Sequence, residues 1–227
     1  MKIDEDMKMK AVLFDVYGTL ISTGTGSINA VKSILSKKHS EIEPEAFYAE
    51  WKQLHKKRMR QTLFLTEREI FMKDLAELYS VYGIAGDYKE DVKIMLESLY
   101  NRTAFPEVPE AINRLSKKYE VIIASNTDTE PLLQNFDYNG LVFGKIYTSE
   151  GLMAYKPNPK FYLTILNECG YSLEEVLYVG DSCEEDIIAP SQLGIKTALV
   201  DRKKSGNEYG QTFSINDISQ LCPILGC

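Results

Sequence analysis

The sequence predicts an α/β protein with a doubly wound parallel sheet, interrupted after its first strand by a long helical segment. Two observations support this prediction. Over residues 101–227, short apolar runs typical of buried parallel strands alternate with amphipathic helical patterns. Residues 25–100 instead contain helical patterns and no convincing strand. A chain of 227 residues is long enough to bury the core that such a fold requires.

The elements follow in order along the chain. Strands are expected at 11–14, 119–125, 176–180 and 196–201, with a weaker candidate at 141–147. Helices are expected between these strands at 108–118, 159–169 and 185–193. The inserted segment is expected to form four helices, at 27–38, 44–60, 66–82 and 89–100. Alternation of strand and helix implies right-handed crossovers and helices on both faces of the sheet.

These elements divide the chain into three parts. Residues 1–9 are charged throughout and are expected to form a disordered tail. Residues 10–24 and 101–227 are expected to form the core with its parallel sheet. Residues 25–100 are expected to form a four-helix-bundle cap over the crevice at the edge of the sheet.

Composition and charge limit the classes of function. A formal net charge of −7 argues against nucleic acid as the main partner. No apolar run approaches the roughly 18 residues of a membrane-spanning helix, so no membrane partner is expected. The charged start of the sequence does not resemble a secretory signal, which suggests a cytoplasmic protein. The sequence leaves open whether the protein is a monomer or a homodimer.

Four loops carry polar side chains suited to chemistry on an anion. In chain order they contain Asp15 and Thr19, Ser125 and Asn126, Lys156, and Asp181 with Asp186. Loops at the carboxyl ends of parallel strands converge on one crevice, so we expect a single site. A carboxylate there can act as nucleophile or as metal ligand, and the carboxylate pair of the fourth loop suggests a divalent cation.

With these motifs in this order, the chain resembles the haloacid dehalogenase-like hydrolases from about residue 10 to residue 202. Two further phrases, at 105–111 and 154–162, support the resemblance. It implies a Rossmann-like core, a mobile cap and an aspartate nucleophile, and it implies one Mg²⁺ if the protein belongs with the phosphatase members. The substrate would be a small anionic molecule.

The resemblance also implies roles for the motif residues. Asp15 would attack the substrate and form a covalent aspartyl intermediate that water later hydrolyses. Ser125 and Asn126 would hold oxygens of the transferring group, and Lys156 would neutralise their charge.

The same resemblance implies how the metal would be held. Asp181, an oxygen of Asp15 and the backbone carbonyl of Tyr17 would hold Mg²⁺. Asp186 would be a further ligand or would support the ligands from behind.

The first and fourth loops nevertheless favour different chemistries. Most phosphatases of the family have a second aspartate, an acid and base, where this chain has Tyr17, and a phenol is a poor acid at neutral pH. The form Asp-x-Tyr-Gly-Thr is similar to the 2-haloacid dehalogenases, which need neither that acid nor a metal. The best local match to their cap arginine is Lys52, which lacks a planar fork, and Arg58 or Arg60 could take its place. Asp181, in contrast, favours a cation and would repel a carboxylate substrate.

Three functions follow from this comparison. A Mg²⁺-dependent phosphatase acting on a small phosphorylated metabolite is the leading interpretation, because an acidic pair beside Asp15 requires a cation. A metal-independent 2-haloacid dehalogenase is the alternative. A non-catalytic regulatory or binding protein of the same fold is the third, although the intact set of nucleophile-site residues argues against it.

Overall fold

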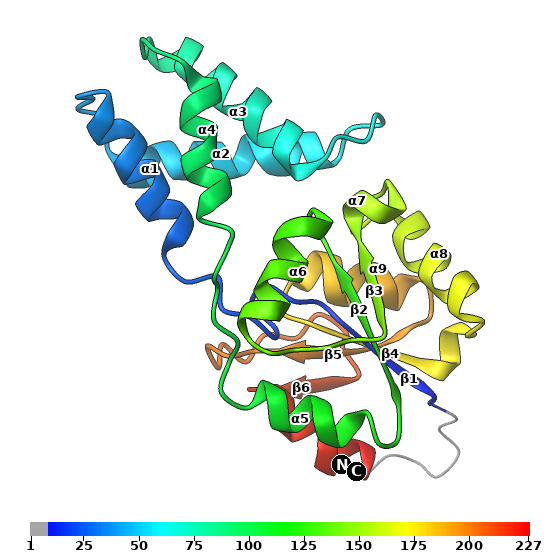
Figure 1. Cartoon of the computed structure of the whole chain (residues 1–227). Helices are drawn as coiled ribbons and strands as arrows, with labels where there is room; N and C mark the ends of the chain where they lie inside the picture. Colours follow the sequence, from blue (N-terminus) through cyan, green and yellow to red (C-terminus); the bar gives the residue numbers. More distant parts are fainter. Residues whose placement is uncertain (1–8) are drawn as a thin grey trace.

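The computed structural model describes residues 9–227 and contains a six-stranded, wholly parallel sheet with helices on both faces (Figure 1). The strand order is β3-β2-β1-β4-β5-β6. The strands are β1 (Ala11–Phe14), β2 (Glu120–Ser125), β3 (Lys145–Thr148), β4 (Val176–Gly180), β5 (Lys196–Val200) and β6 (Phe213–Ile215). The predicted fold class is confirmed, and the expected tail lies outside the described residues except for Met9.

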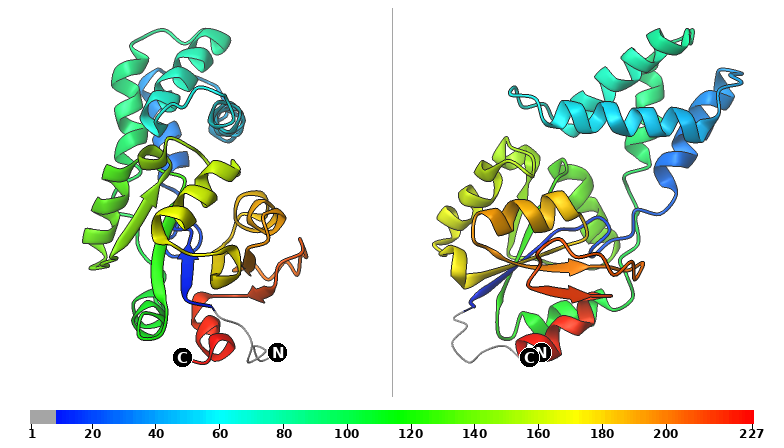
Figure 2. Two further views of the ribbon diagram at one scale, coloured as in Figure 1. Left: turned by 90° about the vertical axis from the view of Figure 1, so that its right-hand side faces the viewer. Right: turned by 180° about the vertical axis from the view of Figure 1, so that it is seen from behind.

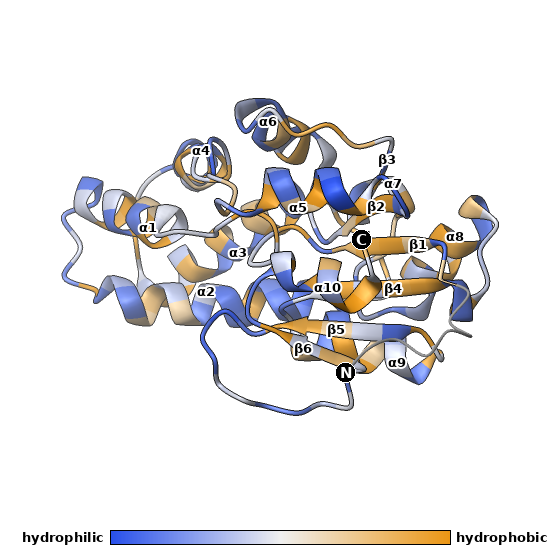
Figure 3. Cartoon of the chain, turned by 90° about the horizontal axis from the view of Figure 1, so that it is seen from below, coloured by the Kyte–Doolittle hydropathy of each residue, from blue (hydrophilic) through white to orange (hydrophobic). Residues whose placement is uncertain are grey.

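The alternation of side chains along β1 explains why its residues are all apolar. Val12 and Phe14 belong to one core cluster, while Ala11 and Leu13 belong to the other. Both faces of this central strand are therefore covered by helices, as Figures 2 and 3 also show.

Different helices cover the two faces of the sheet. Helices α5 (Val108–Leu115), α6 (Thr129–Tyr138) and α10 (Leu221–Leu225) contribute to the first cluster. The second cluster includes α8 (Pro159–Cys169) and residues of α7 (Ser149–Leu152) and α9 (Ala189–Gln192). The helix expected at 185–193 is instead a π-helical turn, Cys183–Ile188, followed by the short α9. The sequence patterns also missed α6 and β6.

Four of the five helices between β1 and β2 form a separate body above the sheet (Figure 1). They are α1 (Gly26–Lys37), α2 (Pro44–Met59), α3 (Glu67–Tyr82) and α4 (Tyr88–Glu97), and we call them the helical insert. The insert has its own apolar core, which includes Phe47, Trp51 and Leu75. Among the described residues, no helix is both long and apolar enough to cross a membrane.

The start of α3 is defined by the local sequence. The Thr66 side chain accepts a hydrogen bond from the Glu69 backbone N–H, and the Glu69 carboxylate accepts one from the Thr66 backbone N–H. This capping box satisfies two backbone donors that the first turn would otherwise leave unpaired. It fixes Glu67 as the first residue of the helix, at the end of the insert that meets the sheet.

The insert contacts the core in two places. One is where the chain passes between core and insert, and the other is at the far end of the insert. The entering and leaving segments run side by side, and the Ser22 N–H donates to the Thr103 carbonyl at 2.9 Å. At the far end, Lys56 and Arg60 of the insert form ion pairs with Glu184, which follows β4. These contacts place the insert over the carboxyl ends of the strands.

Candidate active site

The carboxyl edge of three adjacent strands brings the first, second and fourth loops together. Asp15 follows β1, Ser125 ends β2 and Asp181 follows β4, and β1 pairs with both of the other strands. In the sheet, β2 lies on one side of β1 and β4 lies on the other. This is the switch point of an open parallel sheet, where its loops diverge and leave a crevice.

Lys156 is the centre of the site. Its ammonium lies 2.9 Å from Asp15 Oδ1 and 2.7 Å from Asp186 Oδ1, and all three residues are buried. The Ser125 hydroxyl donates to the same Asp15 oxygen at 3.3 Å. Burial alone would lower the pKa of Lys156, but the Asp15 and Asp186 carboxylates outweigh it and hold that pKa well above its usual value. The lysine is therefore a fixed positive charge at neutral pH.

Three carboxylates surround one point of the crevice. Oxygens of Asp15, Asp181 and Asp186 lie within 4.8 Å of one another. Lys156 pairs with Asp15 and Asp186, while Asp181 makes no ion pair within residues 9–227. Burial and the nearby charge of Asp15 raise the pKa of Asp181 to about 7. Asp181 is also the exposed member of the three carboxylates, which leaves it open to a further cation.

Two glycines let these carboxylates approach the backbone closely. Gly18 has φ +98°, and a Cβ at this position would lie 2.3 Å from Asp181 Oδ2. A Cβ on Gly180 would lie 2.3 Å from the Asp186 carboxyl group. The Tyr17–Gly18 peptide therefore lies beside Asp181, as the expected use of the Tyr17 carbonyl requires. Carboxylate and carbonyl oxygens are the ligands that Mg²⁺ prefers, so this donor set fits the ion.

Asn126 forms its hydrogen bonds within the protein. Its carbonyl accepts the Lys156 backbone N–H at 2.8 Å, and its amide donates to the Lys156 carbonyl at 3.1 Å. The same amide donates to Glu185 Oε2 at 3.1 Å. Asn126 therefore fixes the backbone on which Lys156 is carried, a contact that the sequence motif did not indicate.

The two polar residues beyond Asp15 in the first loop are both shielded. The Tyr17 hydroxyl accepts a hydrogen bond from the Asn135 amide at 3.0 Å, and burial raises the pKa of Tyr17 to about 12. The phenol is thus a weaker acid than in water. The Thr19 hydroxyl is buried and makes no hydrogen bond to any of residues 9–227.

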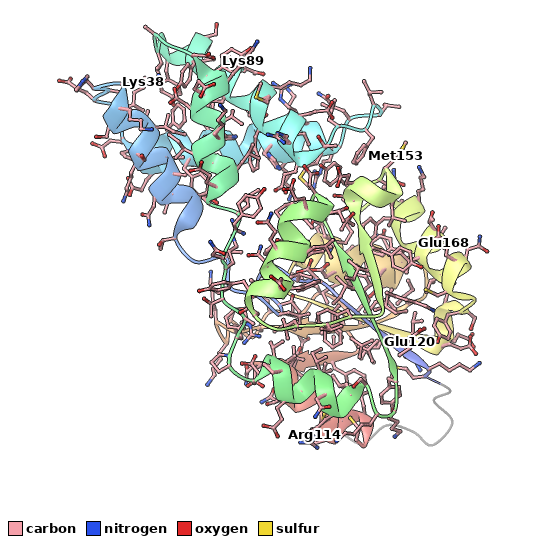
Figure 4. The ribbon with its side chains drawn as sticks, in the orientation of Figure 1. Lys38, Lys89, Arg114, Glu120, Met153 and Glu168 are labelled. Carbon is pink, nitrogen blue, oxygen red and sulfur yellow. The ribbon has the colours of Figure 1, made fainter. Side chains whose placement is uncertain are left out.

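Lys52 lies on α2, in the helical insert. Its ammonium is 4.8 Å from the centre of the Tyr48 ring. It lines a cavity of about 280 Å³ between the insert and the core, and this cavity is also lined by Glu67, Arg102 and Glu185. Figure 4 shows Met153 of the core beneath the loop that joins α2 and α3.

Two arginines also contact the first loop, and the sequence motifs did not indicate them. Arg102 lies with its guanidinium 5.1 Å from the centre of the Tyr17 ring. Arg202 donates to the Gly18 and Thr19 carbonyls at 3.2 and 2.6 Å and so braces the first loop. The only sequence signal for Arg202 was its position directly after the strand expected at 196–201, and no local sequence pattern indicates a role for Arg102.

A parallel sheet with a buried aspartate–lysine–aspartate arrangement at its switch point defines an α/β enzyme whose chemistry depends on carboxylates. A family model for haloacid dehalogenase-like hydrolases matches residues 12–200. The chain therefore belongs to this family of hydrolases, as its motifs predicted.

Similar proteins within the family have different activities. The chain is 27% identical to a phosphoglycolate phosphatase of Haemophilus influenzae over 243 aligned positions, which cover 96% of the chain and 99% of the relative. It is 26% identical to the pyrophosphatase PpaX of Bacillus cereus, with 96% and 97% covered. An L-2-haloacid dehalogenase from Xanthobacter autotrophicus has the same fold, with a TM-score of 0.78, 18% identity, and 96% and 98% covered.

Proposed function

We propose that the protein is a Mg²⁺-dependent phosphohydrolase that acts on a small phosphorylated metabolite, with Asp15 as its nucleophile. The carboxylate cluster is the observation that carries this proposal. Asp15, Asp181 and Asp186 face the ammonium of Lys156, which leaves two negative charges when all three carboxylates are ionised; Asp15 and Asp186 are buried and Asp181 is exposed. One divalent cation balances them, and it would be held by Asp15, Asp181 and the Tyr17 carbonyl. The similarity to two curated phosphatases over nearly the whole chain supports the same class of reaction.

The residues of the site would have different roles in this reaction. Bound Mg²⁺ would supply positive charge next to the transferring phosphoryl group. Lys156 contacts Asp15 and orients it, and Asn126 holds Lys156 in place. Ser125 donates to Asp15 and is close enough to donate instead to a phosphoryl oxygen bound there. Asp186 contacts Lys156 and the Ser182 N–H, so it supports the site from behind.

Tyr17 favours a second candidate, a metal-independent 2-haloacid dehalogenase. A halide leaving group needs no proton, and Tyr17 is a poor proton donor. Asp181 and Glu185 count against this function because both carboxylates would repel the carboxylate of a haloacid. The likeness to dehalogenase structures concerns the fold and does not favour either chemistry.

Hydrolysis of 4-nitrophenyl phosphate, with Mg²⁺ and then with EDTA, tests the proposal. This leaving group needs little protonation, so the weak acidity of Tyr17 does not mask activity. Asp15→Asn is the blank, and Asp137→Asn, at an exposed position on α6, is the matched control. We expect turnover that requires both Mg²⁺ and Asp15. Chloride release from 2-chloropropionate in EDTA, without phosphatase activity, would instead establish the dehalogenase.

A further inference from the structure

The first loop lacks the carboxylic acid that would protonate a poor leaving group. An alkyl phosphate releases an alkoxide, and its departure is slow unless an acid supplies a proton. Tyr17 occupies the position of that acid, and its hydroxyl already accepts a hydrogen bond from Asn135. If the protein hydrolyses ordinary metabolite phosphates, the proton must come from another group that faces the crevice.

Glu67, the first residue of α3, is positioned for this role by the contact between insert and core. The Glu67 and Arg68 N–H groups donate to the two oxygens of Asp128 at 2.8 and 3.0 Å. The Thr127 hydroxyl lies 3.4 Å from Glu67 Oε2. Thr127 is two residues after Ser125, which contacts the nucleophile. The carboxyl group of Glu67 is therefore held against the second loop of the site.

The surroundings of Glu67 connect it to the space where a leaving group would lie. Glu67 lines the cavity of about 280 Å³ that Arg102 and Glu185 also line. Glu185 accepts from Asn126, and Arg102 lies over the Tyr17 ring, so the cavity borders the site.

We propose that Glu67, carried by the helical insert, is the general acid that protonates the leaving oxygen of the substrate in place of the missing aspartate. This inference rests on the proposed phosphohydrolase function. It makes the insert part of the catalytic machinery, because the acid reaches the site only when α3 is docked on Asp128.

The environment of Glu67 favours the protonated form that an acid requires. Burial raises the pKa of Glu67 and is the largest effect. The charged groups that face it are His55 from α2, Arg102 from the segment after α4, and Asp128 from the loop after β2. His55 and Arg102 lower the pKa and Asp128 raises it, and the net shift is upward.

The reaction would proceed by phosphoryl transfer to Asp15, followed by hydrolysis of the aspartyl phosphate. An oxygen of Asp15 bonds to phosphorus while the ester P–O bond breaks, and the leaving oxygen takes the proton of Glu67. The products are an alcohol, an aspartyl phosphate and an ionised Glu67. Water then attacks the phosphorus, Glu67 takes back a proton from that water, and inorganic phosphate leaves. Glu67 and Asp15 both return to their starting states.

Replacement of Glu67→Gln, assayed on a series of leaving groups, tests the proposal. We expect kcat on an alkyl phosphate such as glycerol 3-phosphate to fall by about 10²–10⁴-fold, with hydrolysis of 4-nitrophenyl phosphate within about threefold of wild type. The rate on alkyl phosphates should also lose its decline at high pH, because that decline reports ionisation of the acid. Glu97→Gln, exposed on α4 of the same insert, is the control.

A rescue variant separates the acid from a structural role. In the Glu67→Gln background, Tyr17→Asp restores a carboxylic acid beside the nucleophile and should recover activity on alkyl phosphates. Equal losses on alkyl and aryl phosphates, or an unchanged alkyl rate, would overturn the proposal for Glu67. If the wild-type protein shows no turnover of 4-nitrophenyl phosphate that depends on Asp15, the proposed function itself fails, and the role of Glu67 fails with it.

Discussion

Replacement of Lys156→Met is expected to destabilise the protein strongly. The change removes the ammonium that lies 2.9 Å from Asp15 and 2.7 Å from Asp186, and it leaves two buried carboxylates facing each other. Loss of one member of a buried ion pair typically costs about 3–5 kcal/mol, because the remaining charge has neither water nor a partner. With two carboxylates left, we expect the upper part of that range in metal-free protein.

Urea denaturation in EDTA measures this cost. Lys145→Met is the matched control, because Lys145 also contacts carboxylate oxygens, those of Glu120, at 2.9 and 3.0 Å. That pair is more than one-third exposed, and exposed ion pairs contribute only about 0–1 kcal/mol. Both variants therefore remove a lysine at a similar distance from its carboxylate partners, but one ion pair is buried and the other is exposed.

The pH dependence follows from the raised pKa of Lys156. A lysine whose folded pKa exceeds its unfolded value stabilises the protein fully below the unfolded value, near 10.5. Its contribution is lost only as the pH rises through the higher, folded value. The difference between wild type and Lys156→Met should therefore persist from pH 7 to pH 10. A cost below about 1 kcal/mol, or one equal to that of Lys145→Met, would refute the reasoning.

Three other predictions concern the same loops. Asp181→Asn should lower Mg²⁺ affinity at least tenfold by isothermal titration calorimetry, and unchanged affinity would show that the cation lies elsewhere. Gly18→Ala should cost more than about 1 kcal/mol in urea denaturation and reduce activity, because the new methyl group meets Asp181; Gly210→Ala, also at positive φ but in open space, should keep full activity. Arg202→Met should reduce kcat by about 10–100-fold through a looser first loop, and wild-type kcat would argue against this bracing role.

Local sequence patterns were enough to predict the main features of the fold. The apolar run before Asp15 predicted β1, because a strand covered on both faces is apolar at every position. The expected strand at 176–180 matches β4 residue for residue. The weaker candidate at 141–147 is realised as β3 at Lys145–Thr148, a shorter strand that begins later.

Other elements depended on contacts that no local pattern contains. Only two residues of β6 are buried, and this three-residue strand exists because it pairs with β5. The expected helix at 185–193 begins as a π-helical turn, in which Asp186 contacts Lys156 and the Ser182 N–H. Distant polar contacts therefore outweigh the regular helix that the sequence favours there.

Some residues of the site were likewise predictable from the sequence, whereas others depended on the tertiary structure. Asp15 and Asp181 follow strands, Ser125 ends one, and Lys156 lies in the loop before α8, so the order of these residues along the chain was enough to predict that they meet. Glu67 lies 61 residues before Asp128, and its place beside the second loop depends on the docking of α3. A sequence pattern reports periodicity within one element, whereas the position of an inserted helix is set by hydrogen bonds and packing between elements. The position of Glu67 beside the second loop therefore could not be predicted from the sequence.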